Sequence, residues 1–202
     1  ARRFYRELKA LLPRYGRHAG QLKIMPGLLP IVADSEREAE ALYQQLQALV
    51  QPQVGLSLLA DIAGGTDLSA CPLDGPLPEL PSTQSGVSRR DLLIAVARRE
   101  NLSIRQLYLR MAAARGHLVL VGTPQTIADR MQQWFDEGAA DGFNIMPPYL
   151  PGGLQRFVEG VVPELQRRGV FRRAYSGRTL RDHLGLSRPA YLESGEALTA
   201  HG

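Results

Sequence analysis

Cysteine, histidine and tryptophan are scarce in this chain of 202 residues, which contains one cysteine, four histidines and one tryptophan. The single cysteine, Cys71, excludes an intramolecular disulfide, and it has no recognisable histidine or asparagine partner for a catalytic thiol. No histidine has a second histidine or a cysteine at ligand spacing, so no metal site is expected at His18, His117, His183 or His201. The GxGxxG fingerprint of dinucleotide binding is absent as well.

Long apolar runs and a signal segment are also lacking. The longest apolar runs, such as residues 118–121, are far shorter than the roughly 20 residues that a bilayer span requires. No stretch with a charged, an apolar and a small-residue region opens the sequence, so export is not expected. The composition therefore predicts a soluble, cytoplasmic protein without a membrane partner.

The net charge of +4 comes largely from arginine doublets that are scattered along the chain. A nucleic-acid-binding protein usually concentrates such charge on one element, together with aromatic or base-reading side chains. A solvated surface is therefore the favoured interpretation, and no nucleic-acid partner is expected. A basic nucleic-acid-binding domain stays the weakest alternative. The doublets are Arg2-Arg3, Arg89-Arg90, Arg98-Arg99, Arg167-Arg168 and Arg172-Arg173.

The chain begins with the pattern of a helix already under way. An apolar stripe from Phe4 to Tyr15 ends at Gly16, but no capping residue precedes it. The apolar run 22–33 follows and is typical of a buried strand, although its two prolines require a bend, a bulge or a strand end. Ser35 is expected to cap the next helix, which ends before Pro52.

Residues 51–116 are predicted to be an insertion. Glycine and proline leave no room for long regular elements over 51–87, which is typical of a lid or of a substrate loop. Asp67 and Asp74 are the substrate-loop candidates there, with turn capping as the favoured alternative for each. Two helices are expected next, the second capped by Ser103 and ending at Gly116.

A strand–turn–helix unit covers residues 117–137. His117 to Val121 is expected to be a strand buried on both faces, and Thr123-Pro124 opens a helix whose apolar stripe includes Trp134 and Phe135. A third strand is predicted over 142–146, followed by a long helix kinked at Pro163. The tail from residue 171 is expected to wrap over a surface.

Three parallel strands cannot close a barrel. The chain is therefore either a small open α/β sheet or the C-terminal portion of an eight-stranded (β/α)8 barrel. The uncapped helix at its beginning favours the barrel, with residues 1–170 as its C-terminal part and 171–202 as the tail.

Several segments resemble the nitrilotriacetate monooxygenase component A family of bacterial luciferase-like flavin-dependent monooxygenases, in its C-terminal part. The resemblance spans nearly the whole chain in the right order. It rests on Leu22-Lys-Ile-Met-Pro-Gly-Leu, Asp74-Gly-Pro-Leu-Pro, Val121 to Asp129, Asp141-Gly-Phe-Asn144, Val162 to Gly169, Thr179-Leu180-Arg181 and Leu184-Gly185-Leu186.

The resemblance implies a (β/α)8 TIM barrel and a two-component reaction. A separate NAD(P)H-dependent flavin reductase would supply reduced FMN (FMNH2), and the protein would use it with O2 to oxygenate a small organic substrate. A homo-oligomer is expected. The family's principal flavin-binding and catalytic residues would lie upstream of Ala1, so we expect the chain alone to be inactive. The rival hypothesis is a non-catalytic half-barrel that acts as a structural or interaction module.

Three places in the chain are candidates for ligand contacts. Asn144 and Met146 are placed at the C-terminal, catalytic end of a barrel strand, and one of them could line the flavin cavity. Met25 and Gly27 are further cofactor-binding candidates, because the prolines beside them suggest a bulge near the cofactor. A structural irregularity without a role in binding is the favoured alternative. The free amides behind Gly122-Thr123 could bind an anion, although an ordinary helix cap is favoured.

Overall fold

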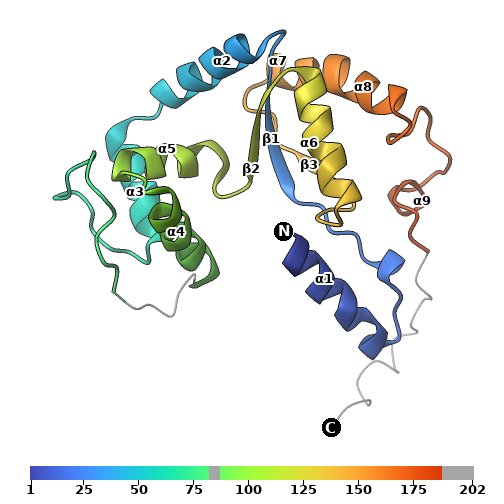
Figure 1. Cartoon of the computed structure of the whole chain (residues 1–202), viewed down its shortest axis with the longest axis horizontal. Coiled ribbons are helices and arrows are strands. Elements are labelled where there is room, and N and C mark those ends of the chain that lie inside the picture. Colours follow the sequence, from blue (N-terminus) through green and yellow to red (C-terminus); the bar gives the residue numbers. More distant parts are fainter. Residues whose placement is uncertain (82–86, 188–202) are drawn as a thin grey trace.

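The computed structural model describes residues 1–81 and 87–187, and it has the form of an arch (Figure 1). Helices α3, α4 and α5 form one limb, the sheet lies in the middle, and α6, α8, α9 and α1 form the other limb. The elements are α1 (Arg2–Leu11), β1 (Gly27–Val32), α2 (Glu36–Ala48), α3 (Pro52–Ile62), α4 (Val87–Glu100), α5 (Ile104–Ala114), β2 (Leu118–Gly122), α6 (Pro124–Asp136), β3 (Asn144–Ile145), α7 (Gly152–Arg156), α8 (Val162–Arg167) and α9 (Leu180–His183).

The sheet is parallel, with β1 between β2 and β3. Every residue of β1 is buried, as the sequence predicts. Leu28 and Val32 pack with α6 and the helix after β3, whereas Leu29 and Ile31 pack with α2 and Ala114. The three expected parallel strands are therefore confirmed, and helices cover both faces of the central one.

The two prolines of the first strand segment cost the sheet no hydrogen bond. The Asn144 amide donates to Pro26 O and the Met146 amide donates to Leu28 O, so alternate residues of this segment face β3. Pro30 faces the same side, but β3 ends at Ile145, beside Leu28. The nitrogen of Pro30 therefore has no ladder partner to lose, although Pro30 lies within β1 and in unbroken register with β2. Pro26 directly precedes β1, which is the strand end that the sequence left open as one of three cases.

Strand β2 is less buried than the sequence predicts. Its first four residues are only partly buried, because β2 is an edge strand in the described sheet. Phe135 is 56% exposed and Trp134 is only partly buried, so the core stripe of α6 ends earlier than expected. Only the first turns of α6 pack on the sheet, through Ile127, Ala128 and Met131.

The prediction that residues 51–87 hold no long regular element is wrong. Helix α3 occupies Pro52–Ile62 and packs closely against α5. Its proline stands at the first helical position, where a missing N–H costs nothing, and Gly55 lies against the ring of Tyr108. A separate core of α3, α4 and α5 forms around Leu59, Leu93 and Leu107. That 51–116 is an insertion in a barrel stays a prediction.

The helix after β3 is irregular beside Pro163, where the sequence predicts a kink. A π-helical turn spans Phe157–Val161, and Pro163 lies in the first turn of α8, directly after it. A π turn accommodates the carbonyl that a proline leaves without its partner. Phe157, Val161 and Leu165 remain buried on one face through the π-helical turn, and Gly169 ends the helix with a φ of 74°.

Helix α1 is present as predicted, but most of the apolar stripe is exposed, and only Leu12, directly after the helix, is buried. None of its residues is buried, and Phe4 is 60% exposed. The helix is fastened by polar contacts instead: the Tyr5 hydroxyl and the Lys9 ammonium both lie 2.9 Å from the carboxylate of Asp141. Among the described residues, no helix is long and apolar enough to cross a membrane.

Candidate functional site

The carboxyl edge of the sheet is filled by a side chain of the protein itself. Glu36, in the first turn of α2, accepts hydrogen bonds from the Thr126 hydroxyl and, at 3.3 Å, from the Thr123 amide. Both hydrogen bonds lower the pKa of the Glu36 carboxyl, and the bond from Thr126 has the larger effect. Thr123 caps α6 with Pro124 behind it, so the helix-cap interpretation of Gly122-Thr123 is correct.

Replacing Glu36 by glutamine is expected to cause a small decrease in the melting temperature at pH 7. The carboxylate stabilises the positive end of α6, and its lowered pKa means that this contribution is present above the usual range of glutamate and is lost as the pH falls. Glu38→Gln removes the same charge from the same turn of α2 and serves as the control. Equal effects of the two substitutions at pH 7 would contradict the assignment.

The four cofactor-binding candidates lie together, but at the amino end of the sheet. The Asn144 side-chain amide donates to Met25 O at 3.1 Å. A Cβ on Gly27 would lie 2.8 Å from the Met146 sulfur and 2.7 Å from a ring nitrogen of His117. Asn144 and Met146 do lie at the C-terminal end of their own strand, because β3 ends at Ile145, but the register places that end beside Gly27, the first residue of β1, and not at the carboxyl edge of the sheet. The cofactor-binding role therefore stays a prediction that the strand register does not support.

Asp67 and Asp74 both have structural partners. Asp67 accepts a hydrogen bond from the Ser69 amide at 2.8 Å, which is the turn-capping arrangement. Asp74 accepts two hydrogen bonds from the Arg105 guanidinium, at 2.7 and 3.1 Å. The hydrogen bonds from Ser69 lower the pKa of the Asp67 carboxyl, and those from Arg105 lower the pKa of the Asp74 carboxyl. Asp74 thereby fastens the loop before α4 to the first turn of α5. Their substrate-loop role stays a prediction.

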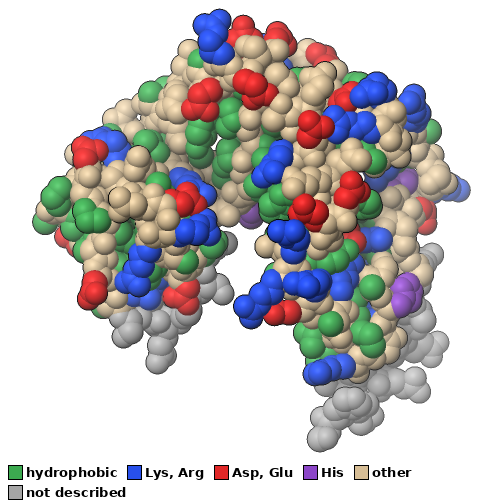
Figure 2. Space-filling view, in the orientation of Figure 1, with side chains coloured by type: hydrophobic (Ala, Val, Ile, Leu, Met, Phe, Trp, Pro, Cys, Tyr) green, Lys and Arg blue, Asp and Glu red, His purple; other side chains and the backbone are tan. Residues whose placement is uncertain are grey.

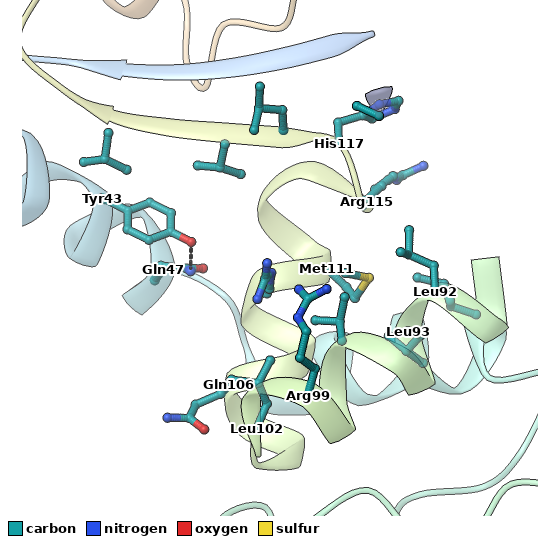
Figure 3. Close-up of a pocket in the computed structure, with 18 of the residues that line it drawn as sticks. Tyr43, Gln47, Leu92, Leu93, Arg99, Leu102, Gln106, Met111, Arg115 and His117 are labelled. Atoms are coloured by element: carbon teal, nitrogen blue, oxygen red, sulfur yellow. Dashed lines mark hydrogen bonds between the residues drawn. The ribbon is translucent and has the colours of Figure 1, made fainter. Parts of the chain in front are cut away.

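A pocket lies on the underside of the arch, where Figure 2 shows the molecule hollowed between its limbs. Its volume is about 710 Å³, within the range of small-molecule sites. The walls come from α2, α4, α5 and β2, with Trp134 and Ala1 from the other limb. The apolar lining includes Leu92, Leu93, Val96, Met111, Leu118 and Val119 (Figure 3).

Polar groups enter this pocket at a few points. The Tyr43 hydroxyl accepts a 2.7 Å hydrogen bond from the Gln47 side chain, and burial raises the pKa of the phenol, so it is neutral at pH 7. His117 lines the pocket and also lies against Gly27, which joins the pocket to the four cofactor-binding candidates. Arg99, Arg110 and Arg115 are the cationic lining residues.

Sequence reasoning missed this pocket because its lining comes from segments that lie far apart in the sequence, from Ala1 to Trp134. The only signal was the doublet Arg98-Arg99, which composition assigned to a solvated surface. Trp134, placed in the core by its helical spacing, stands on the pocket's wall and lies 6.3 Å from Phe143, centroid to centroid.

Comparison with known proteins identifies the class. The chain is 54% identical to nitrilotriacetate monooxygenase component A of Aminobacter aminovorans over 187 residues, which is 92% of the chain and 41% of the relative. It is 51% identical to N-acetyl-S-(2-succino)cysteine monooxygenase of Bacillus subtilis (strain 168), over 94% of the chain and 43% of the relative. No protein-family model matches the chain.

Solved structures agree with these relatives. The EDTA monooxygenase from Chelativorans sp. BNC1 matches with a TM-score of 0.64 at 36% identity, over 92% of this chain and 43% of that one. A riboflavin lyase solved with modified FMN matches with a TM-score of 0.66 at 30% identity, over 90% and 39% of the two chains. The chain thus spans about two-fifths of the length of these proteins.

The fold and these matches define a part of a luciferase-like (β/α)8 monooxygenase barrel. Within that class, the chain belongs to the nitrilotriacetate monooxygenase component A family and corresponds to its C-terminal part. The resemblance of the sequence motifs is therefore confirmed.

Proposed function

We propose that the chain supplies the C-terminal part of a two-component monooxygenase that uses reduced FMN and O2 to oxygenate a small organic substrate. The observation that carries this proposal is 51–54% identity to two monooxygenases over more than nine-tenths of the chain. The flavin would come from an NAD(P)H-dependent reductase, and the assembly would be a homo-oligomer. Reduced FMN, when bound, supplies the electrons that activate O2.

Three helix N-termini of this chain do not fit the phosphate of FMN. Phosphate groups are commonly bound by free amides at a helix N-terminus. Here Ser35 caps α2, Ser103 and Gln106 cap α5 reciprocally, and Thr123 with Glu36 occupies the N-terminus of α6. Glu36 would also repel a phosphate. We therefore assign the phosphate anchor to a place other than these three N-termini, and we infer that it lies outside this chain.

What this chain offers is a wall for the substrate. The apolar surface of α4, α5 and β2 excludes water from one side of the pocket, and the arginines and Tyr43 hold polar groups of a bound molecule in place. Orientation of the substrate and exclusion of water are the contributions that a protein makes when the cofactor carries the chemistry.

A hybrid enzyme tests the proposal. In nitrilotriacetate monooxygenase component A, this chain replaces the region that it matches, and the hybrid is assayed with a flavin reductase, NADH, FMN and O2. We expect the hybrid to bind reduced FMN under anaerobic conditions and to oxygenate nitrilotriacetate, whereas this chain alone binds FMN at least about 100-fold more weakly, because the N-termini of α2, α5 and α6 are capped.

The unmodified relative and its upstream part alone are the controls. Tight FMN binding by this chain alone would overturn the assignment of the phosphate anchor. A hybrid that has native circular dichroism but binds no reduced FMN would overturn the proposal, and it would favour the non-catalytic half-barrel. The exposed side chains of Phe4, Tyr15 and Val54 are the observation behind that rival function.

A further inference from the structure

A second cavity lies in the limb that contains α6, α8 and α9 (Figure 1). Its volume is about 430 Å³, which is within the range of small-molecule sites. Helix α6 and the helix after β3 form two of its walls, and the segment 170–184 forms a third. The lining is largely apolar, and its aromatic and thioether side chains are Phe135, Phe143, Phe157, Phe171, Met25 and Met131.

This cavity lies at the amino end of the sheet. Asp141 lines it, and the Asp141 amide donates to Ile24 O, a short distance before β1 begins. In a (β/α)8 barrel, reactants bind at the carboxyl ends of the strands. Among the described residues, none lines both this cavity and the pocket under the arch. A molecule in this cavity is therefore held away from the reacting atoms.

Large apolar side chains at the mouth of the cavity are in contact with solvent. Phe135 of α6 is 56% exposed, Val170 is 43% exposed and Leu180 of α9 is 71% exposed. They come from three separate segments and converge on one opening. An apolar molecule that enters the cavity covers them and removes their surface from water, which favours its binding.

One guanidinium group stands at this mouth. Arg172 lines the cavity and is exposed, and its guanidinium carbon lies 5.0 Å and 5.5 Å from the ring centroids of Phe171 and Tyr175. It donates a hydrogen bond to His183 O at 3.3 Å, which leaves most of its five N–H donors free. In the described part of the chain, Arg172 has no ion pair. The two rings and the carbonyl hold the guanidinium in place.

The other charged lining residue is already neutralised. Asp141 pairs with Lys9 at 2.9 Å and accepts hydrogen bonds from Tyr5 and Ile24. The segment 164–187 contains six arginines and two acidic residues, so the potential at the mouth is positive. A planar guanidinium fork matches a carboxylate in a bidentate arrangement. The lining therefore favours a ligand with an apolar body and a single carboxylate.

We propose that this cavity binds an amphiphilic monocarboxylic acid, with the apolar chain among the phenylalanine and methionine side chains and the carboxylate on Arg172. The site is separate from the pocket that the proposed function uses, and the bound acid is not oxygenated. Because the walls come from α6, the helix after β3 and the segment 170–184, the acid holds these three parts of the limb together.

The test is a calorimetric titration of the chain with decanoate, kept below the concentration at which it forms micelles. Decanol, which has the same chain length and no charge, is the control ligand. We expect saturable binding of decanoate and binding of decanol that is weaker by about fivefold or more. Arg172→Gln is expected to raise the Kd of decanoate about five- to tenfold and to leave that of decanol unchanged within about twofold, because it removes a charge-assisted hydrogen bond.

Two further variants locate the site. Arg173→Gln removes the same charge from the neighbouring position, but Arg173 does not line the cavity, so the Kd of decanoate is expected to stay within about twofold. Leu180→Ser removes an exposed part of the apolar wall and is expected to raise the Kd of both ligands about two- to fivefold. Circular dichroism of each variant verifies the fold.

Three results of the titrations would overturn the inference: no saturable binding of decanoate, equal weakening by Arg172→Gln and Arg173→Gln, or no effect of Leu180→Ser. Oxidised FMN and nitrilotriacetate are added as competitors, and displacement of decanoate by either at stoichiometric concentration would assign the cavity to the oxygenation reaction. In sedimentation velocity, a dimer that decanoate dissociates would assign it to a contact between copies of the chain. Because the binding measurement needs neither flavin nor O2, its failure is separate from a failure of the hybrid enzyme.

Discussion

Replacing Asp141 by alanine is expected to reduce the free energy of unfolding by about 2 kcal/mol. Its carboxylate accepts hydrogen bonds from the Tyr5 hydroxyl at 2.9 Å and the Ile24 amide at 2.8 Å, and it pairs with the Lys9 ammonium at 2.9 Å. The Lys9 and Asp141 side chains are only 10% and 15% exposed. Removing the carboxylate leaves a desolvated ammonium with two carbonyl contacts, to Ala19 and Leu22, and an amide with no acceptor.

Urea unfolding followed by circular dichroism measures this effect, and Glu137→Ala is the control. Glu137 also fastens α1, through a 3.2 Å ion pair with Arg2, but both side chains are well exposed. A surface pair of this kind contributes at most about 0.5–1 kcal/mol. If the two substitutions destabilise the protein equally, the buried network is not what holds α1.

The effect of Asp141 is expected to depend on pH. Burial alone would raise the pKa of this carboxyl, but the hydrogen bonds from Ile24, Lys9 and Tyr5 outweigh it, so the pKa lies below its usual range. A carboxyl with a lower pKa in the folded state stabilises the protein above its unfolded pKa, about 4, and loses that contribution as the pH falls. The difference between the wild type and Asp141→Asn should therefore shrink below about pH 4. A constant difference would indicate that charge is not involved.

Local signals were sufficient to predict many of the elements. Ser35, Ser103 and Thr123 each cap a helix because their hydroxyls satisfy an amide three residues on, and this contact is encoded within four residues of sequence. The buried run of β1 and the π-helical turn before Pro163 are likewise local. The register of β3 with β1 is a long-range property and is not encoded locally. It pairs Asn144 with the first residue of β1 and not with the carboxyl edge of the sheet.

The helix α3 and the pocket escaped prediction for a related reason. Gly55 and the glycines after Ile62 weaken the helical signal of residues 52–62, yet α3 forms because Tyr108, more than 50 residues later, covers its glycine. Tertiary packing of this kind overrides local propensity. The arginines of the pocket were visible only as charge, because no sequence pattern shows that Arg99, Arg110 and Arg115 face one cavity.

Gly55→Val is expected to destabilise the protein by about 3 kcal/mol, the upper range for an overpacked core. Gly55 is the point where α3 meets α5, and a Cβ there would lie 2.3 Å from a ring carbon of Tyr108. The Tyr108 ring is 2% exposed and is held among Leu59, Leu68 and Leu107, so it cannot move aside without disturbing the core of this limb. The higher helix propensity of valine than of glycine, a few tenths of a kcal/mol, offsets little of the clash.

Ser57→Val places the same side chain on the exposed face of α3 and isolates the propensity effect. Urea unfolding should show a change within about 0.5 kcal/mol for Ser57→Val, against the large loss for Gly55→Val. The double variant with Tyr108→Ala should recover part of the loss relative to the sum of the two single variants, because the shorter side chain frees the space that valine needs. Strictly additive losses would show that the Tyr108 ring is not what demands a glycine at position 55. The close packing of α3 on α5 would then need another cause.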